Sequence, residues 1–305
     1  MPRANGNNKE GLGTVIQNNL VRAISADGSV MACALNATEI VAEIERIHTT
    51  SAVVTAALGR LATAASMAGS LLKGEQDSVT MRINGGGPAG TLIAVADSFG
   101  NVRAYVGNPV VELPLNQYGK LDVAGAVGRD GYLSVIKDVG LKEPATGTVE
   151  IVSGEIAEDI TNYYATSEQV PTACGLGVLV NPDLTVKGAG GYLVQLLPFA
   201  DESCVELLEQ NIKKLPPVSQ MYADGMTAEE GCMRLLEGLE PNVLDTFQPV
   251  YKCDCSLERV TRALVSMGRE ELLKMAEEQG GAEVCCHFCN KKYHLTAEEL
   301  RALAR

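Results

Sequence analysis

The hydrophobic spacing of the first 200 residues is that of several short strands and two long helices. Apolar stretches separated by polar residues and glycine predict strands at 13–16, 21–24 and 30–33. Apolar residues then recur every three or four positions between Ala37 and His48, which predicts an amphipathic helix. The next stretch, 51–72, is apolar around most of its circumference and rich in alanine and glycine, so we expect a helix buried between layers.

Strand-like alternation follows this second helix. Two strands, at 79–83 and 91–95, flank a glycine-rich turn at 84–90. Further strands are expected at 101–106, 132–136, 148–152, 175–180 and 191–197. Because the strands occur in runs and do not alternate with helices, the pattern favours an α+β domain, which we assign to residues 1–200.

The pattern becomes helical after Pro198. A helix is expected at 201–215, where Pro216 and Pro217 end it. Thr227 and Glu230 have the spacing of a capping box, in which a hydroxyl and a carboxylate bind the free N–H groups at the start of a helix. We therefore expect residues 201–247 to form a helical linker.

The last unit, 248–305, carries the strongest chemical signal in the chain. Cys253-x-Cys255 is followed, after thirty residues, by Cys286-x-x-Cys289. Zinc takes four thiolate ligands at tetrahedral angles, and two turns that each carry a pair of cysteines supply them. Between the two pairs we expect one helix that Ser256 caps and Gly268 ends, and a second from Glu270 to Glu278. These helices bury little apolar surface, so a metal would be their main support. We predict a zinc site with one ion per chain.

The spacing leaves the ligand set open in one respect. A register that uses Cys285, or a site with three cysteines and either His287 or His294, is also compatible with the sequence. We favour Cys286 because it keeps the two-residue spacing to Cys289. The remaining cysteines occur singly in apolar stretches and are expected to be small buried side chains: Cys33, Cys174, Cys204 and Cys232.

No catalytic constellation emerges elsewhere. The glycine-rich turn 84–90 lacks the Lys-Ser/Thr ending of a phosphate-binding loop, and a strand follows it where a helix would be needed, so we expect a wide hairpin turn. His48 is the only histidine outside the cysteine-rich region and is expected simply to end its helix. We therefore expect a protein that is not an enzyme.

Charge and targeting signals further restrict the binding partners and the cellular location that we expect. The formal net charge of −13 argues against binding to nucleic acid and to anionic membranes, both of which require basic surface. The N-terminus has no apolar signal segment, and the stretch 51–72 is interrupted by Arg60 and too weakly hydrophobic to predict a membrane span. We expect a cytoplasmic protein whose nine cysteines are kept reduced.

Several sequence blocks, in addition to the cysteines, resemble those of one known family. They are Gly100–Val106, Gly154–Asp159, Tyr163–Pro171, Ala189–Pro198, and Glu283–Cys289 with Tyr293. On these blocks the chain, from about residue 13 to 300, resembles the thirty-three-kilodalton heat-shock protein family of redox-regulated holdase chaperones. It departs from the family in its polar first dozen residues, in Cys285 and in its cysteines outside the zinc site.

The resemblance implies a fold, a mechanism and partners. The large domain would have helices sandwiched between β-sheets, and 248–305 would be a redox switch. Zinc would hold the four cysteines as thiolates, and oxidation would release it by forming the disulfides Cys253–Cys255 and Cys286–Cys289. The switch domain would then unfold, the linker 201–247 would loosen, and the exposed surface would bind unfolding client proteins without ATP. The active form would be a homodimer.

Three other classes compete with this interpretation. One is an enzyme in the α+β domain with a purely structural zinc ion, for which no site can be named. A zinc-containing thiol–disulfide oxidoreductase would use Cys286 and Cys289, but the thioredoxin-like βαβ unit that usually carries such a motif is missing from the pattern. A zinc-stabilised regulatory protein that binds nucleic acid is opposed by the negative charge.

Overall fold

Two five-stranded antiparallel sheets form the centre of the molecule. The computed structural model describes residues 19–198 and 200–304. The first sheet has the spatial order β10 (Asn242–Phe247), β1 (Asn19–Ile24), β2 (Val30–Asn36), β9 (Val186–Leu196) and β8 (Thr172–Val180). The second has the order β5 (Val102–Val106), β4 (Leu92–Asp97), β3 (Ser78–Gly86), β6 (Gly128–Asp138) and β7 (Ala145–Glu150). The predicted α+β class is confirmed.

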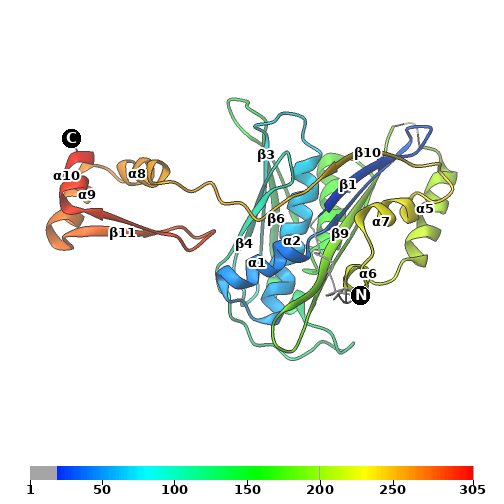
Figure 1. Cartoon of the computed structure of the whole chain (residues 1–305), viewed down its shortest axis with the longest axis horizontal. Helices are drawn as coiled ribbons and strands as arrows, with labels where there is room; N and C mark the ends of the chain where they lie inside the picture. The colour runs from blue at the N-terminus through cyan, green and yellow to red at the C-terminus, as the bar shows by residue number, and fades with distance from the viewer. Residues whose placement is uncertain (1–18, 199, 305) are drawn as a thin grey trace, which may run out of the picture.

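The helices α1 (Thr38–His48) and α2 (Ala52–Ser70) lie between the two sheets (Figure 1). Leu58 and Leu61 of α2 are fully buried in one apolar cluster with residues of both sheets. By length and mean hydropathy (1.3) α2 is long and apolar enough to cross a membrane, but 89% of that window is buried inside the protein, as in a core helix. The buried helix predicted at 51–72 is confirmed, and its all-round apolar surface is explained by contact with a sheet on each side.

Three helices of the predicted linker cover the outer face of the first sheet. They are α5 (Glu202–Lys214), α6 (Val218–Ala223) and α7 (Ala228–Leu235). The helix α6 lies directly on the backbone of β8 and β9 because glycines face it: a Cβ added at Gly177 would lie 2.3 Å from the Ser219 nitrogen, and one at Gly188 would lie 2.5 Å from the Ala223 nitrogen. The linker helices are therefore packed on the large domain through their own apolar cluster, which includes Val21 and Cys232.

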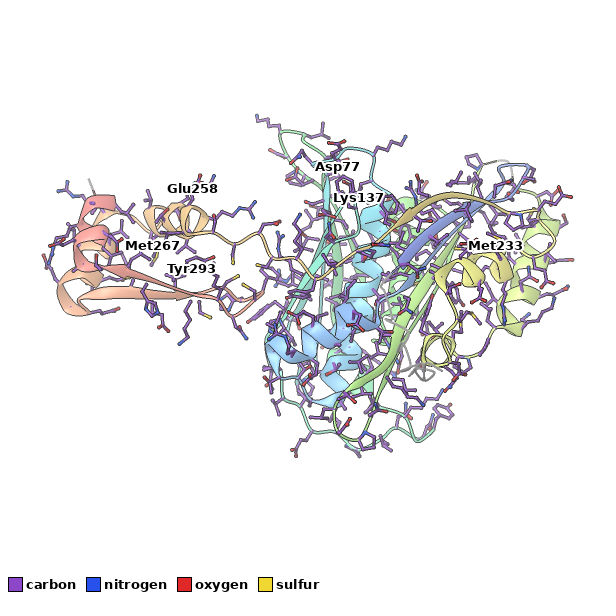
Figure 2. All side chains as sticks on the ribbon, in the orientation of Figure 1. Asp77, Lys137, Met233, Glu258, Met267 and Tyr293 are labelled. Carbon is purple, nitrogen blue, oxygen red and sulfur yellow. The ribbon has the colours of Figure 1, made fainter. Side chains whose placement is uncertain are left out.

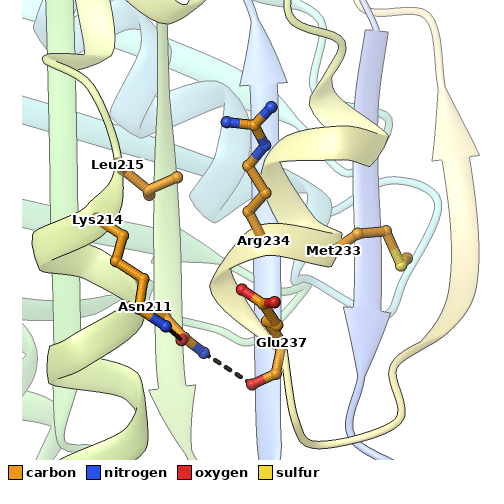
Figure 3. A pocket seen from close by; sticks show the side chains of 6 residues that line it. All are labelled: Asn211, Lys214, Leu215, Met233, Arg234 and Glu237. Carbon is orange, nitrogen blue, oxygen red and sulfur yellow. Dashed lines mark hydrogen bonds between the residues drawn. The ribbon is translucent and has the colours of Figure 1, made fainter.

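A buried asparagine joins α5 to α7 (Figure 3). Asn211 is 1% exposed, and its amide nitrogen donates to the carbonyl oxygens of Leu235 (3.1 Å) and Glu237 (2.8 Å). These carbonyls lie at the end of α7, where no further helical N–H reaches them. The hollow between the two helices, of about 440 Å³, is lined by Asn211, Lys214, Leu215, Met233, Arg234 and Glu237.

The segment 201–247 ends in a strand, whereas the sequence predicts only helices there. The strand β10 pairs antiparallel with β1 at the edge of the first sheet. Its side chains alternate only weakly between polar and apolar, because Val243 and Leu244 are both exposed (42% and 49%). An edge strand with solvent on one side needs no strict alternation, so the hydrophobic pattern does not reveal it. The predicted divisions at residues 200 and 247 stay a prediction.

Most of the other predicted elements are confirmed. The strands expected at 21–24, 30–33, 79–83, 91–95, 101–106, 132–136, 148–152, 175–180 and 191–197 overlap observed strands, and the strand expected at 13–16 lies outside the described residues. The turn 84–90 joins β3 and β4 as the expected hairpin. Three short elements before residue 200 were not predicted: α3 (Val123–Val127), α4 (Ala157–Tyr163) and the π-helical turn η1 (Tyr164–Glu168). The helix α6 and, near the C-terminus, β11 (Gly281–Cys285), β12 (Lys292–Thr296) and α10 (Ala297–Leu303) were not predicted as separate elements either.

A fully buried carboxylate organises the loop between β7 and α4. One oxygen of Asp159 accepts from the backbone nitrogens of Val152 (2.8 Å) and Ser153 (3.0 Å), and the other accepts from that of Ile156 (2.9 Å). Ile156 has a φ of +72°, a conformation that β-branched residues rarely adopt. The carboxylate therefore holds a strained backbone at the start of α4.

The last described part of the chain, residues 253–304 (the C-terminal unit), is small and projects from the large domain. It contains α8 (Leu257–Val265), α9 (Arg269–Glu278), β11 (Gly281–Cys285), β12 (Lys292–Thr296) and α10 (Ala297–Leu303). The tip of its β-hairpin points towards the large domain, and α9 and α10 lie at the far end (Figure 1). Its buried cluster has only eight side chains among the described residues, including Tyr293 of the hairpin (Figure 2).

Candidate metal centre

Four cysteines converge where the C-terminal unit meets the large domain. The Sγ atoms of Cys253, Cys255, Cys286 and Cys289 all lie within 4.8 Å of one another. The shortest distances join the two turns: 3.6 Å from Cys253 to Cys286 and 3.3 Å from Cys255 to Cys289. Zinc–sulfur bonds of about 2.3 Å at tetrahedral angles place sulfurs about 3.8 Å apart. The cluster can therefore hold a metal ion, and its size suits zinc.

The alternative ligands considered from the sequence lie outside this cluster. Cys285 is exposed at the end of β11. The His287 ring packs against the Tyr105 ring, with 5.1 Å between the centroids, and His294 lies beside Glu283, with Nδ1 3.5 Å from the carboxylate. Among the described histidines, cysteines and carboxylates, the structure thus brings together the set favoured by the two-residue spacing.

Two local structures hold the cysteine pairs in place. The hairpin turn after β11 is closed by hydrogen bonds from the Cys286 nitrogen to the Lys291 oxygen (2.9 Å) and from the Asn290 nitrogen to the Cys286 oxygen (2.8 Å). Asn290 takes a left-handed φ of +57°, which asparagine tolerates well. On the other turn, the Ser256 hydroxyl accepts from the Arg259 nitrogen and starts α8 directly after Cys255.

Burial and neighbouring groups shift the pKa values of these thiols in different directions. Burial raises the pKa of Cys253 and of Cys289. Burial acts in the same sense at Cys255, but the Tyr293 hydroxyl, which donates to its Sγ over 3.1 Å, and the adjacent thiols together lower that pKa to about 7. A cation among the four sulfurs would favour the thiolate form of each, since nearby positive charge lowers the pKa of a thiol.

The other cysteines are placed largely as expected. Cys33, Cys204 and Cys232 are buried, and Cys174 is partly exposed. Burial raises the pKa of Cys33 to about 12, so this thiol is protonated and unreactive at neutral pH.

The two cysteine turns dock on β5 and on the end of α1. Arg103 pairs with Asp254 (3.1 Å), and its guanidinium lies 5.4 Å from the centroid of the Phe288 ring. The Asn290 side chain donates to the Ile47 oxygen (2.6 Å). We call these contacts, with that of His287 on Tyr105, the turn interface.

The residues of the large domain in the turn interface were not found from the sequence. Arg103 and Tyr105 belong to the block Gly100–Val106, for which the sequence predicts a strand and a resemblance to a family but no contact with the cysteine turns. His48 ends α1 as expected and donates from Nε2 to the Ala104 oxygen (3.0 Å). Burial lowers the pKa of His48, so it is neutral at physiological pH.

Replacing Arg103 by alanine is expected to loosen the turn interface without removing the metal ligands. A partly exposed ion pair and a cation–π contact together contribute about 1–2 kcal/mol, so the opening equilibrium should rise about five- to thirtyfold. Hydrogen exchange of the amides at 286–291 measures this, with bound metal counted in the same samples. Arg82→Ala, an exposed arginine of the same sheet, is the control. Unchanged exchange in Arg103→Ala would contradict the assigned role.

Comparison with known proteins identifies the family. A family model described as "Hsp33 protein" matches residues 18–296. Among curated proteins, the chain is 50% identical to a 33 kDa chaperonin of Bacillus licheniformis over 93% of this chain and 98% of that protein. It is 49% identical to a 33 kDa chaperonin of Clostridioides difficile over 92% and 96% of the two chains.

A solved structure agrees with these relatives. The crystal structure of a 33 kDa chaperonin from Thermotoga maritima, described as a heat shock protein 33 homologue, superposes with a TM-score of 0.87 at 38% identity. The match covers 95% of this chain and 98% of that one, so both sheets and the C-terminal unit are included. The chain belongs to the Hsp33 family, and its relatives indicate that it is a chaperone.

Proposed function

We propose that this protein is a redox-regulated holdase chaperone, switched on by oxidation of a zinc site formed by Cys253, Cys255, Cys286 and Cys289. The observation that carries the proposal is the position of the four sulfurs, which lie within 4.8 Å of one another in a unit with only eight buried core side chains among those described. A unit of this kind depends on its metal for stability, and its metal depends on reduced cysteines.

The chemistry of the switch follows from the thiols. Zinc, when bound, stabilises the thiolate form and closes the two turns against each other. Each pair of thiolates gives two electrons to one molecule of hydrogen peroxide, which takes up two protons from the solvent: an S–S bond forms, the O–O bond breaks, and two water molecules leave. We propose Cys253–Cys255 and Cys286–Cys289 as the pairs, after the family resemblance.

Loss of the metal should unfold the C-terminal unit. Structural zinc sites contribute about 10–16 kcal/mol of apparent binding free energy, which is as large as the whole net stability of a small domain, about 5–15 kcal/mol. The linker helices pack on the first sheet through Cys204, Leu208 and Leu235. They would then be followed by an unfolded segment in place of the folded C-terminal unit, and their packing should weaken. Apolar surface exposed in this way binds unfolding proteins without nucleotide.

The site also supports a chaperone over an oxidoreductase. Cys286 and Cys289 lie in a hairpin turn between two antiparallel strands, β11 and β12, and not at the start of a helix that follows a strand. The proposal includes a homodimer as the oxidised, active form, a cytoplasmic location, and no binding of nucleic acid or membranes, as the sequence led us to expect.

Oxidation in solution tests the proposal. The reduced protein should bind one zinc ion per chain and allow a thermally unfolding client to aggregate. After treatment with hydrogen peroxide and mild heat it should release the zinc and suppress aggregation, and dithiothreitol with added zinc should reverse both changes. Equal protection in the two states, or protection in neither, would exclude the redox switch.

A further inference from the structure

The chain between α7 and the metal centre connects the edges of both sheets. We call residues 242–252 the strap. Its first part is β10, which pairs with β1 at the edge of the first sheet. Its last part runs along β5 at the edge of the second sheet, where the Val102 nitrogen donates to the Val250 oxygen (3.0 Å) and the Lys252 nitrogen donates to the Val102 oxygen (2.9 Å).

The strap covers apolar surface that belongs to the main core. Phe247 and Tyr251 are partly buried against the cluster that contains α2. Pro249 lies over Gly100, where an added Cβ would be 3.4 Å from the proline Cβ. Removal of the strap would therefore expose both unpaired backbone groups and apolar side chains along one side of the molecule.

β1 pairs less regularly with the strap than with its other neighbour, β2. β1 and β2 pair without interruption over six residues, whereas the register between β1 and β10 shifts between Arg22 and Ala23. The outward side chains of the strap are also exposed, with Val243 at 42% and Val250 at 50%. An irregular edge strand with exposed side chains is less stabilised than a regular strand inside the sheet and is more easily removed.

The position of the strap in the chain makes its removal depend on the metal centre. Five residues, 248–252, separate Phe247 from Cys253, and the Tyr251 hydroxyl donates to the Phe288 oxygen of the second cysteine turn. While the four cysteines are held together, the end of the strap is fixed to the large domain. Once the C-terminal unit unfolds, that end loses its attachment to the cysteine turns and is held only by its own contacts with β5 and the core.

One side chain gives the covered edge a chemical preference. Arg22 of β1 pairs with Asp245 and donates to the Ser70 oxygen at the end of α2 (2.5 Å), and its guanidinium lies 5.3 Å from the centroid of the Phe247 ring. Arg22 therefore binds an acidic residue and an aromatic residue two positions apart in the strand beside it.

We propose that the strap occupies a binding site for client protein: the edge of β1, which accepts an extended client segment as an added strand once the strap has left. This inference rests on the proposed function and says where and how the client binds. Pairing through backbone hydrogen bonds suits a chaperone, because every unfolded chain offers the same N–H and C=O groups whatever its sequence. Arg22 adds a preference for segments with a carboxylate near an aromatic ring.

A peptide with the sequence of residues 240–250 tests the proposal directly. With a fluorescent label, it should bind the oxidised full-length protein at least tenfold more tightly than the reduced, zinc-loaded protein, in which β10 occupies the edge. Two methylated versions distinguish strand pairing from apolar docking: one has N-methyl groups at Asp245 and Phe247, the other at Thr246. These amides point to opposite sides of the strand, so one version should lose at least tenfold in affinity and the other should bind as the parent does.

Client protection is measured with the same peptides. The parent peptide and the methylated version that binds should reduce suppression of client aggregation by the oxidised protein, and the version that does not bind should leave it unchanged. Absence of peptide binding to the oxidised protein, equal binding of both methylated versions, or full client protection at saturating peptide would each overturn the inference. An oxidised protein that holds clients but ignores the peptide contradicts this inference alone, whereas one that holds no client contradicts the proposed function.

Discussion

Replacing Cys286 by serine is expected to abolish zinc binding and to unfold the C-terminal unit. The Sγ of Cys286 lies 3.6 Å from that of Cys253, inside the cluster, and a serine hydroxyl is a poor ligand for zinc. The loss should approach the full 10–16 kcal/mol or so that a structural zinc site contributes, since a unit with eight buried core side chains in its described part has little else to hold it. Zinc content per chain and hydrogen exchange across 257–304 measure the two effects.

The neighbouring cysteine supplies the matched control. Cys285 is exposed and lies outside the cluster, so Cys285→Ser should bind one zinc ion per chain and keep the exchange pattern of the parent protein. In an aggregation assay with a thermally unfolding client, the Cys286→Ser protein should suppress aggregation without oxidant. The Cys285→Ser protein should suppress it only after oxidation. Loss of zinc in Cys285→Ser, or its retention in Cys286→Ser, would show that the ligand register is wrong.

Replacing Asp159 by asparagine is expected to lower the thermal stability of the large domain substantially. The two carboxylate oxygens accept hydrogen bonds from the nitrogens of Val152, Ser153 and Ile156 in a fully buried position. An asparagine amide has one acceptor oxygen, so its NH2 group would face a backbone N–H, and the strained φ of Ile156 would lose its partner. We expect a cost of about 2–4 kcal/mol, or a fall of about 5–15 °C in the melting temperature.

The adjacent acidic residue again allows a comparison. Glu158 is exposed, so Glu158→Gln removes the same charge from the same turn without removing a buried acceptor. Its melting temperature should stay within about 2 °C of the parent, as for most surface substitutions. Similar melting temperatures for Asp159→Asn and Glu158→Gln would mean that the hydrogen bonds of the buried Asp159 carboxylate do not stabilise the large domain.

The features that could be predicted from the sequence are those with a local signature. The helix α2 is apolar on all sides because it lies between two sheets, and that composition is visible in a single segment. The cysteine cluster was predicted because tetrahedral thiolate coordination imposes short spacings within each pair, so Cys286 could be preferred over Cys285 before the geometry was known. In both cases one physical requirement acts on residues close together in the chain.

The features that could not be predicted depend on contacts between distant segments. β10 is a strand because β1 offers it an edge, and its own exposed valine and leucine indicate no secondary structure strongly. The turn interface joins Arg103 to Asp254 and Asn290 to Ile47, pairs separated by 151 and 243 residues. Arginine and asparagine are common on any surface, so nothing in the local sequence marks these as contact residues.

The pairing of the first described strand with one of the last also affects how the protein is made. Leu20 of β1 pairs with Phe247 of β10, 227 residues later (247 − 20). At a synthesis rate of about 5–20 residues per second, the ribosome needs about 10–45 s to produce this partner. During that time the edge of β1 stays uncovered on the nascent chain. Each new copy therefore passes through an aggregation-prone stage that ends only when β10 has emerged.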